Sequence, residues 1–132
     1  MDLSRYLNAA LVVAVLAQSA VPAPRKGGNR DAAKVKNPVA STAESTTAGR
    51  RAYVRLCVRC HGPEGKGDGE AAAGATPSEL TGAQWNYGST DGKLFSVIHT
   101  GTSANMAGYA ERMSDTDIWN VVNYIRTFKR QG

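Results

Sequence analysis

The sequence predicts an all-α fold in one small domain, and three observations lead to that prediction. Apolar residues near the C-terminus recur at the three- and four-residue spacing of an amphipathic helix. No stretch alternates convincingly between apolar and polar residues, as a half-buried strand would. The chain has 132 residues, which is enough for one domain at most. We therefore expect helices joined by loops around a single core.

Residues 1–23 are predicted to be an export signal. Arg5 lies in a short polar start, residues 9–17 are apolar, and Ala17-Gln18-Ser19 fits a small-x-small cleavage site. The apolar run is shorter than the ~20 residues that usually span a bilayer, which favours a cleaved signal. A retained anchor that reaches from Tyr6 to Val21 is the alternative. Both interpretations predict an exported domain.

Residues 24–46 are predicted to be a flexible basic linker. The segment is rich in Ala, Lys, Asn, Ser and Thr, with Pro38 in its middle and Val35 and Val39 as its only larger apolar residues. Much of the formal net charge of +5 lies here, so the remaining chain is nearly balanced. No basic face with interleaved aromatic residues is present, and we expect no binding to nucleic acid. Association of this basic segment with an anionic membrane is a weaker alternative to a solvated tether.

The folded domain is predicted to cover residues 47–132, with a first helix that begins near Thr46 or Thr47 and continues to Leu56. Gly49, Tyr53 and Leu56 recur at helical spacing and define one face. A glycine inside a helix costs about 1 kcal/mol relative to alanine. Close approach of another helix would explain why glycine stands at position 49.

The segment Cys57-Val58-Arg59-Cys60-His61 is the attachment pattern of haem c. Each thiol can form a thioether with a haem vinyl group, and His61 can then ligate the iron. Residues 62–69 are rich in glycine, which lets the backbone pass close to a flat cofactor. Disulfide exchange would need a thioredoxin-like context, and a zinc site would need four ligands, for which only His99 could be added. We expect one covalent haem c, bound through Cys57 and Cys60.

Two further helices are predicted. Residues 70–82 form a loop with a short helical turn near Ala71–Ala73. A helix over Asp91–His99 places Leu94, Phe95 and Ile98 on one side and ends at Gly101. The last helix begins after Ser114 as N-cap, with Asp115 and Asp117 in its first turn and Lys129 and Arg130 near its end. Its apolar stripe comprises Ile118, Val121, Val122, Ile125 and Phe128, with Tyr124 beside it.

Three residues are candidates for the second iron ligand, namely Met106, Met113 and His99. Met113 directly precedes the Ser114 cap, where it can pack on Ile118 as a hydrophobic staple. Met106 lies in a loop flanked by glycine and serine and belongs to no apolar stripe. We favour Met106, while Met113, His99 and an open iron site remain alternatives.

Taken together, these motifs resemble the class I monohaem c-type cytochromes, and the likeness covers Thr47 to Phe128. It rests on the haem motif with its glycine-rich loop and on several shorter motifs. These are Gly49-x-x-x-Tyr53, Pro77-x-x-Leu80, Trp85-x-Tyr87-Gly88, Phe95-x-x-Ile98-x-x-Gly101, Met106, Ser114-Asp115-x-Asp117-Ile118-Trp119 and Val122-Asn123-Tyr124-Ile125. The sequence departs from many relatives in having Ala107 instead of proline after Met106.

The resemblance implies a cytochrome c-like fold, a small helical domain wrapped around one haem. The first and last helices would cross, with Gly49 and Tyr53 meeting Tyr124. The Pro77 carbonyl would accept the His61 Nδ1 proton. Trp85 and Tyr87 would lie near a haem propionate.

The expected function is one-electron transfer through a haem c ligated by His61 and Met106. We find no catalytic set of residues, so the chain is predicted not to be an enzyme. We expect transient contacts with redox partner proteins in the bacterial periplasm, where the domain would be soluble or anchored to the inner membrane. Arg55, Arg59, Lys66 and Arg112 could steer docking. A cytochrome subunit of a dehydrogenase or oxidase complex is the alternative, followed by a ligand sensor or peroxidase with an open iron site.

Overall fold

The computed structural model describes residues 29–72, 74, 77–82, 85–103 and 105–128. Its elements in chain order are η1 (Asp31–Lys34), α1 (Ala43–Leu56), α2 (Val58–His61), η2 (Glu70–Ala72), α3 (Asp91–Thr100) and α4 (Asp115–Ile125). All are helical, and this part of the chain has no strand beyond an isolated bridge between Gly101 and Ala107. The predicted all-α fold is confirmed. The predicted export segment 1–23, residues 24–28, and Lys129 and Arg130 lie outside the described residues.

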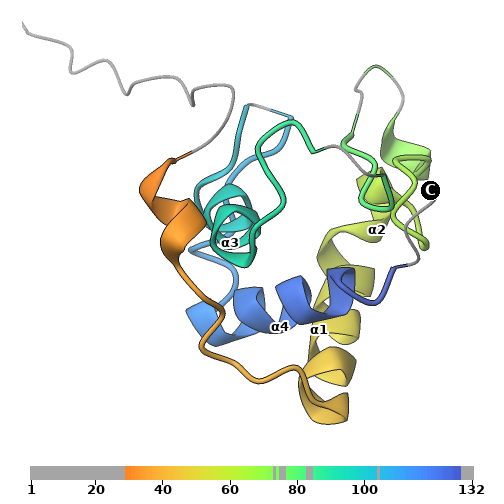
Figure 1. The fold of residues 1–132 in the computed structure, drawn as a ribbon. Helices are drawn as coiled ribbons and strands as arrows, with labels where there is room; N and C mark the ends of the chain where they lie inside the picture. Colours follow the sequence, from red (N-terminus) through yellow and green to blue (C-terminus); the bar gives the residue numbers. More distant parts are fainter. Residues whose placement is uncertain (1–28, 73, 75–76, 83–84, 104, 129–132) are drawn as a thin grey trace, which may run out of the picture.

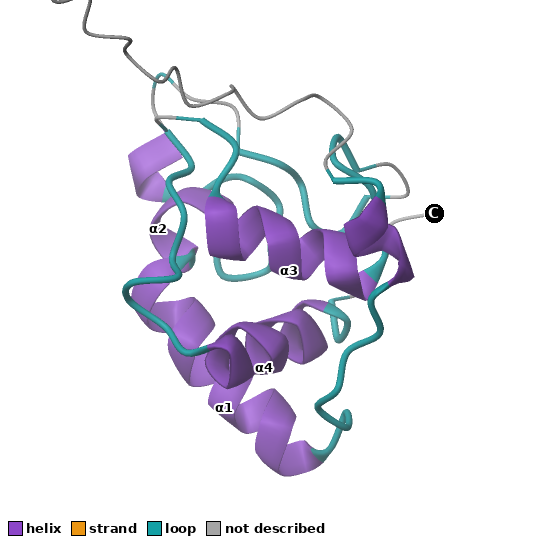
Figure 2. Cartoon of the chain, turned by 90° about the vertical axis from the view of Figure 1, so that its left-hand side faces the viewer, coloured by secondary structure: helices purple, strands orange, loops and turns teal. Residues whose placement is uncertain are grey.

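Helices α1 and α4 cross and form the most extensive contact between elements (Figures 1 and 2). At the crossing, a Cβ atom on Gly49 would collide with the Asn120 carbonyl oxygen and lie 2.9 Å from the Tyr124 Cβ. Tyr53 is fully buried, and its ring packs edge-to-face on those of Tyr124 and Phe128, each with a centroid separation of 5.3 Å. The close approach expected at Gly49 is therefore present.

The apolar stripe of α4 forms the centre of the core. Ile118, Val121 and Val122 are fully buried. Ser114 caps the helix, since its hydroxyl accepts the Asp117 N–H, and the Asp117 carboxylate accepts the Ser114 N–H in return. The helix ends at Ile125, earlier than the stripe suggested, and Phe128 reaches the core from the turn that follows.

The segment from residue 29 to 42 differs from the predicted flexible linker. Its short helix η1 packs against α3, with Ala32 buried, and the Ala32 and Val35 carbonyls lie so close to Gly92 that a side chain there would collide with them. Helix α1 begins at Ala43, because the Thr42 hydroxyl accepts the Ser45 N–H as N-cap, and not near Thr46 as expected. Residues 29–46 are thus packed on or part of the helical body.

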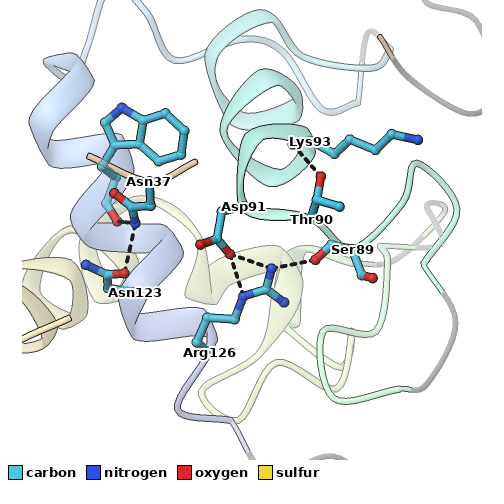
Figure 3. Close-up of polar contacts among 8 residues, drawn as sticks. Asn37, Ser89, Thr90, Asp91, Lys93, Asn123 and Arg126 are labelled. Carbon is cyan, nitrogen blue, oxygen red and sulfur yellow. Dashed lines mark hydrogen bonds and ion pairs between the residues drawn. The ribbon is translucent and has the colours of Figure 1, made fainter. Parts of the chain in front are cut away.

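Amide side chains fasten this segment to α4 (Figure 3). Asn37 Nδ2 donates to the Trp119 carbonyl at 3.2 Å and to Asn123 Oδ1 at 2.8 Å. Asn123 Nδ2 in turn donates to the Val39 carbonyl at 3.1 Å and to Ser45 Oγ at 2.8 Å. Buried amide groups are costly unless they are hydrogen-bonded, so these contacts hold the segment at one position on the helix.

Helix α3 begins after the Thr90 cap and ends at Thr100, followed by the C-cap Gly101, whose φ of 82° suits glycine. The predicted bounds agree to within one residue. Its buried residues Leu94 and Ile98 face the core. No helix among the described residues is long and apolar enough to cross a membrane.

Candidate functional site

The end of α1 delivers the two thiols and the imidazole to one place. Cys57 is the C-cap of α1, where its N–H donates to the Tyr53 carbonyl at 2.8 Å, and α2 starts at the next residue. The His61 N–H donates to the Cys57 carbonyl at 2.9 Å, so one tight turn carries all three groups. Both cysteines are half-buried free thiols.

These three residues line a cavity of about 200 Å³. A single water molecule needs only about 10–15 Å³, so the space suits something much larger. All four α-helices contribute to its mostly apolar wall, from which only a few polar groups project. The lining residues from the helices and from the C-cap of α1 are Tyr53, Leu56, Cys57, Cys60, His61, Leu94, Val97, Ile98, Val121 and Ile125. A large, flat and largely apolar group fits these walls and this set of donor atoms.

His61 is oriented by a backbone carbonyl. Its Nδ1 lies 3.0 Å from the Ser78 carbonyl oxygen, so the expected bond to the Pro77 carbonyl is wrong. The Pro77 carbonyl points toward Gly67, where an added Cβ would lie 2.9 Å away, while Pro77 itself lines the cavity. In the tautomer that donates from Nδ1, the other ring nitrogen is free to ligate a metal.

Burial shifts the pKa values of His61 and Cys57. It lowers the pKa of His61, an effect that the Ser78 hydrogen bond partly opposes, so the neutral imidazole needed for ligation is favoured. Burial also raises the pKa of the Cys57 thiol to about 12; the nearby Cys60 adds to this shift and Arg112 opposes it. A disulfide-exchange enzyme needs the opposite, a readily formed thiolate. The described residues hold no cluster of three or more His, Cys, Asp or Glu that could hold a metal ion.

Of the three candidates for a second iron ligand, Met106 is the one on the cavity wall. It is half-buried in the loop between α3 and α4 and lines the same cavity as the helical residues. Met113 is buried in the core and is not among the lining residues. His99 also lies away from the lining; its ring stacks on Phe95, and its Nε2 is 3.6 Å from the Asp115 carboxylate.

Trp85 and Tyr87 also line the cavity. The Trp85 indole N–H donates to the Gly82 carbonyl at 2.9 Å, which restrains the ring at the cavity wall. Several lining residues were not predicted from the sequence, and two of them make hydrogen bonds at the site. Ser78 is the partner of His61, and Tyr109 donates to the Leu56 carbonyl at 3.2 Å beneath the Arg112 guanidinium. Neither residue belongs to a helical stripe, and no local pattern signals its role.

Residues 44–125 match the family described as cytochrome C oxidase, cbb3-type, subunit III. The chain is similar to the cbb3-type cytochrome c oxidase subunit FixP of Bradyrhizobium sp. (strain ORS 278), with 31% identity over 80 residues, which are 61% of this chain and 26% of that protein. The FixP subunit of Bradyrhizobium diazoefficiens (strain USDA 110) is 32% identical over 79 residues, which are 60% and 26% of the two chains. The chain thus matches about a quarter of the length of these relatives.

Solved structures show the same architecture. A chain of the Kuenenia stuttgartiensis reducing HAO-like protein complex Kustc0457/Kustc0458 aligns with a TM-score of 0.64 and 26% identity, over 72% of this chain and 49% of that one. Cytochrome cL from Hyphomicrobium denitrificans aligns with a TM-score of 0.60 over 81% of this chain and 64% of its own, and at 24% identity it supports the fold alone. The expected cytochrome c-like fold is confirmed.

Proposed function

The chain belongs to the family of cytochrome c oxidase, cbb3-type, subunit III, as a c-type cytochrome domain of electron transfer, and from this premise we propose that it carries single electrons through one haem c. Cys57 and Cys60 would hold the haem covalently. His61 and Met106 would ligate its iron from opposite sides.

One observation carries the proposal: two thiols, a half-buried imidazole whose pKa is lowered by burial, and a thioether line the same mostly apolar cavity. A haem supplies a reversible one-electron iron couple. The residues of the chain supply what surrounds it. The two cysteines restrict its position, the Ser78 carbonyl orients His61, and the apolar walls exclude water. A methionine thioether favours ferrous iron more than a second imidazole does, so we expect a comparatively high reduction potential.

The cavity composition also supports a closed iron site over an open one. Met106 and His61 line the same cavity, so Met106 is available as the second ligand of a haem iron bound to His61. A sensor or peroxidase needs that position open. Slow binding of carbon monoxide to the reduced protein at neutral pH is expected, and rapid binding would favour the sensor interpretation.

The partners are proposed to be redox proteins. A free carrier with transient partners in the periplasm is the first interpretation, and residues 1–23 would direct its export. The likeness to FixP, which is a subunit of a cbb3-type oxidase, favours a second one, in which the chain is a fixed subunit of an oxidase or dehydrogenase complex. Co-purification with other subunits at constant stoichiometry would support the second interpretation, whereas isolation as a single chain would support the first.

The test is an absorption spectrum of the protein exported together with a haem-assembly system. We expect a coloured protein whose pigment stays bound in acidified organic solvent, and a weak far-red band in the oxidised state that marks sulfur on ferric iron. Colourless protein, or pigment released by the solvent, would contradict the proposal.

Two matched variants assign the sulfur ligand. Met106→Ala should abolish the far-red band, because its side chain lines the cavity. Met113→Ala should keep the band while destabilising the fold, because Met113 lies in the core. Loss of the band in Met113→Ala alone would overturn the assignment.

A further inference from the structure

Arg126 connects three segments that surround the cavity. It follows Ile125 at the end of α4, and its Nε and Nη2 atoms lie 2.8 and 2.6 Å from Asp91 Oδ1. Nη2 also donates to the Ser89 carbonyl (Figure 3). One guanidinium thus links α4, the first residue of α3 and the loop between Trp85 and Thr90.

We propose that Arg126 and Asp91 act as positioning residues that hold the loop Trp85–Gly88 closed against the haem cavity and keep water from entering there. The inference rests on the proposed function, since it assigns a role to these residues toward the bound haem. Neither residue lines the cavity, so each acts through the segments that it joins.

The Arg126 contact can hold the loop because the segments that it joins all border the cavity. Trp85, Asn86, Tyr87 and Gly88 all line the cavity, and Ser89 is the next residue. Ile125 and Leu94, which line it from α4 and α3, lie one and three residues from Arg126 and Asp91. If the guanidinium were lost, the loop could separate from both helices where it lines the cavity.

Two other hydrogen bonds among the described residues of this loop are local. The Gly88 N–H donates to the Trp85 carbonyl at 3.1 Å, and the Trp85 indole donates to the Gly82 carbonyl. They shape the turn but do not join it to α4. The Arg126 contact does, and it spans 37 positions in sequence to Ser89.

The strength of the contact is moderate, because the two side chains are 29% and 36% exposed. A pair at this depth can shift an equilibrium between closed and open loop by about fivefold. That is enough to change access of water and small ligands without unfolding the domain. A wetter site stabilises the more highly charged ferric state, so opening should lower the reduction potential.

The test uses two variants of the exported, haem-containing protein, one that removes a positive charge and one that removes a negative charge. Arg126→Gln and Asp91→Asn should both lower the midpoint potential, and both should speed the binding of added imidazole to the oxidised protein by about fivefold. If the charges acted only through space, Arg126→Gln would lower the potential and Asp91→Asn would raise it. Shifts in opposite directions, with unchanged imidazole binding, would overturn the inference.

Two further variants keep the test decisive. Arg126→Lys keeps the charge but loses the planar donor geometry that reaches both Asp91 and Ser89, so it should behave like Arg126→Gln in imidazole binding. Wild-type behaviour of Arg126→Lys would contradict the inference, even if Asp91→Asn failed to accumulate. Ser45→Ala removes a buried hydroxyl that bonds to Asn120 and Asn123 and should lower stability while leaving the potential unchanged. A wild-type protein without covalent haem would instead refute the proposed function.

Discussion

The α1–α4 crossing and the loop that carries Met106 border the same cavity but are built in different ways. At the crossing, Gly49 allows backbone contact and Tyr53 is fully buried. In the loop, residues 103, 105, 107 and 108 are exposed, and Met106 alone among its neighbours is half-buried. The loop is held by short-range bonds, such as that from the Thr102 N–H to the Met106 carbonyl at 2.9 Å.

The α1–α4 crossing supplies stability, whereas the loop that carries Met106 leaves room for adjustment at the cavity. A closely packed crossing cannot change shape without a large loss of contacts. A loop with few buried contacts can take different conformations at small cost. The crossing therefore fixes the wall that carries Cys57, Cys60 and His61, while the loop leaves the position of Met106 more adjustable. Three predictions test this comparison through the free energy of unfolding of the haem-containing protein.

The largest loss is expected for Tyr53→Ala at the crossing. Tyr53 is completely buried, and its hydroxyl donates to the Gly62 carbonyl at 2.8 Å, so truncation should lower the free energy of unfolding by about 3–5 kcal/mol. Tyr53→Phe, which removes only the hydroxyl, should cost about 1 kcal/mol. Chemical denaturation measures both, and equal losses would show that packing of the ring contributes little.

Gly49→Ala should cost about 1–3 kcal/mol, because the added methyl group would overlap the Asn120 carbonyl. Alanine is otherwise the better helix former by about 1 kcal/mol, so the sign of the change is informative. Thr47→Ala, at an exposed position of α1, is the control and should be neutral or slightly stabilising. A stabilised Gly49→Ala variant would mean that the helices are farther apart than described.

The smallest effect is expected in the loop. Asn105 is exposed, and its side chain is not needed for the turn, since its backbone N–H contacts Ser103 Oγ. Asn105→Ala should change the free energy of unfolding by no more than about 0.5 kcal/mol. A loss as large as that of Gly49→Ala would place the loop within the cooperative core and remove the contrast between the two regions.

The sequence was most informative where chemistry is local. The Ser114 cap, the acidic first turn and the apolar stripe identified α4 because each depends on neighbours within a turn or two. The helical spacing of Gly49 and Tyr53 similarly indicated which face of α1 approaches another helix. The thiol and imidazole spacing indicated the haem, whose attachment remains a prediction.

The sequence was least informative where polar groups find distant partners. Asn37 looked like part of a solvated linker, yet its partners Trp119 and Asn123 are 82 and 86 positions away. An amide side chain leaves no periodic pattern that could reveal such a contact. The prediction of the Pro77 carbonyl as the partner of His61, in place of the observed Ser78 carbonyl, was wrong for a similar reason. The path of the loop decides which carbonyl faces the ring.

By itself, the sequence indicated the main helices, predicted the haem motif and pointed to the family to which the domain belongs, because these depend on spacing along the chain. The tertiary structure decided which methionine reaches the cavity, which carbonyl orients His61 and how Arg126 joins α4 to the loop before α3. These contacts depend on where separate segments meet in space, which packing of the whole domain sets.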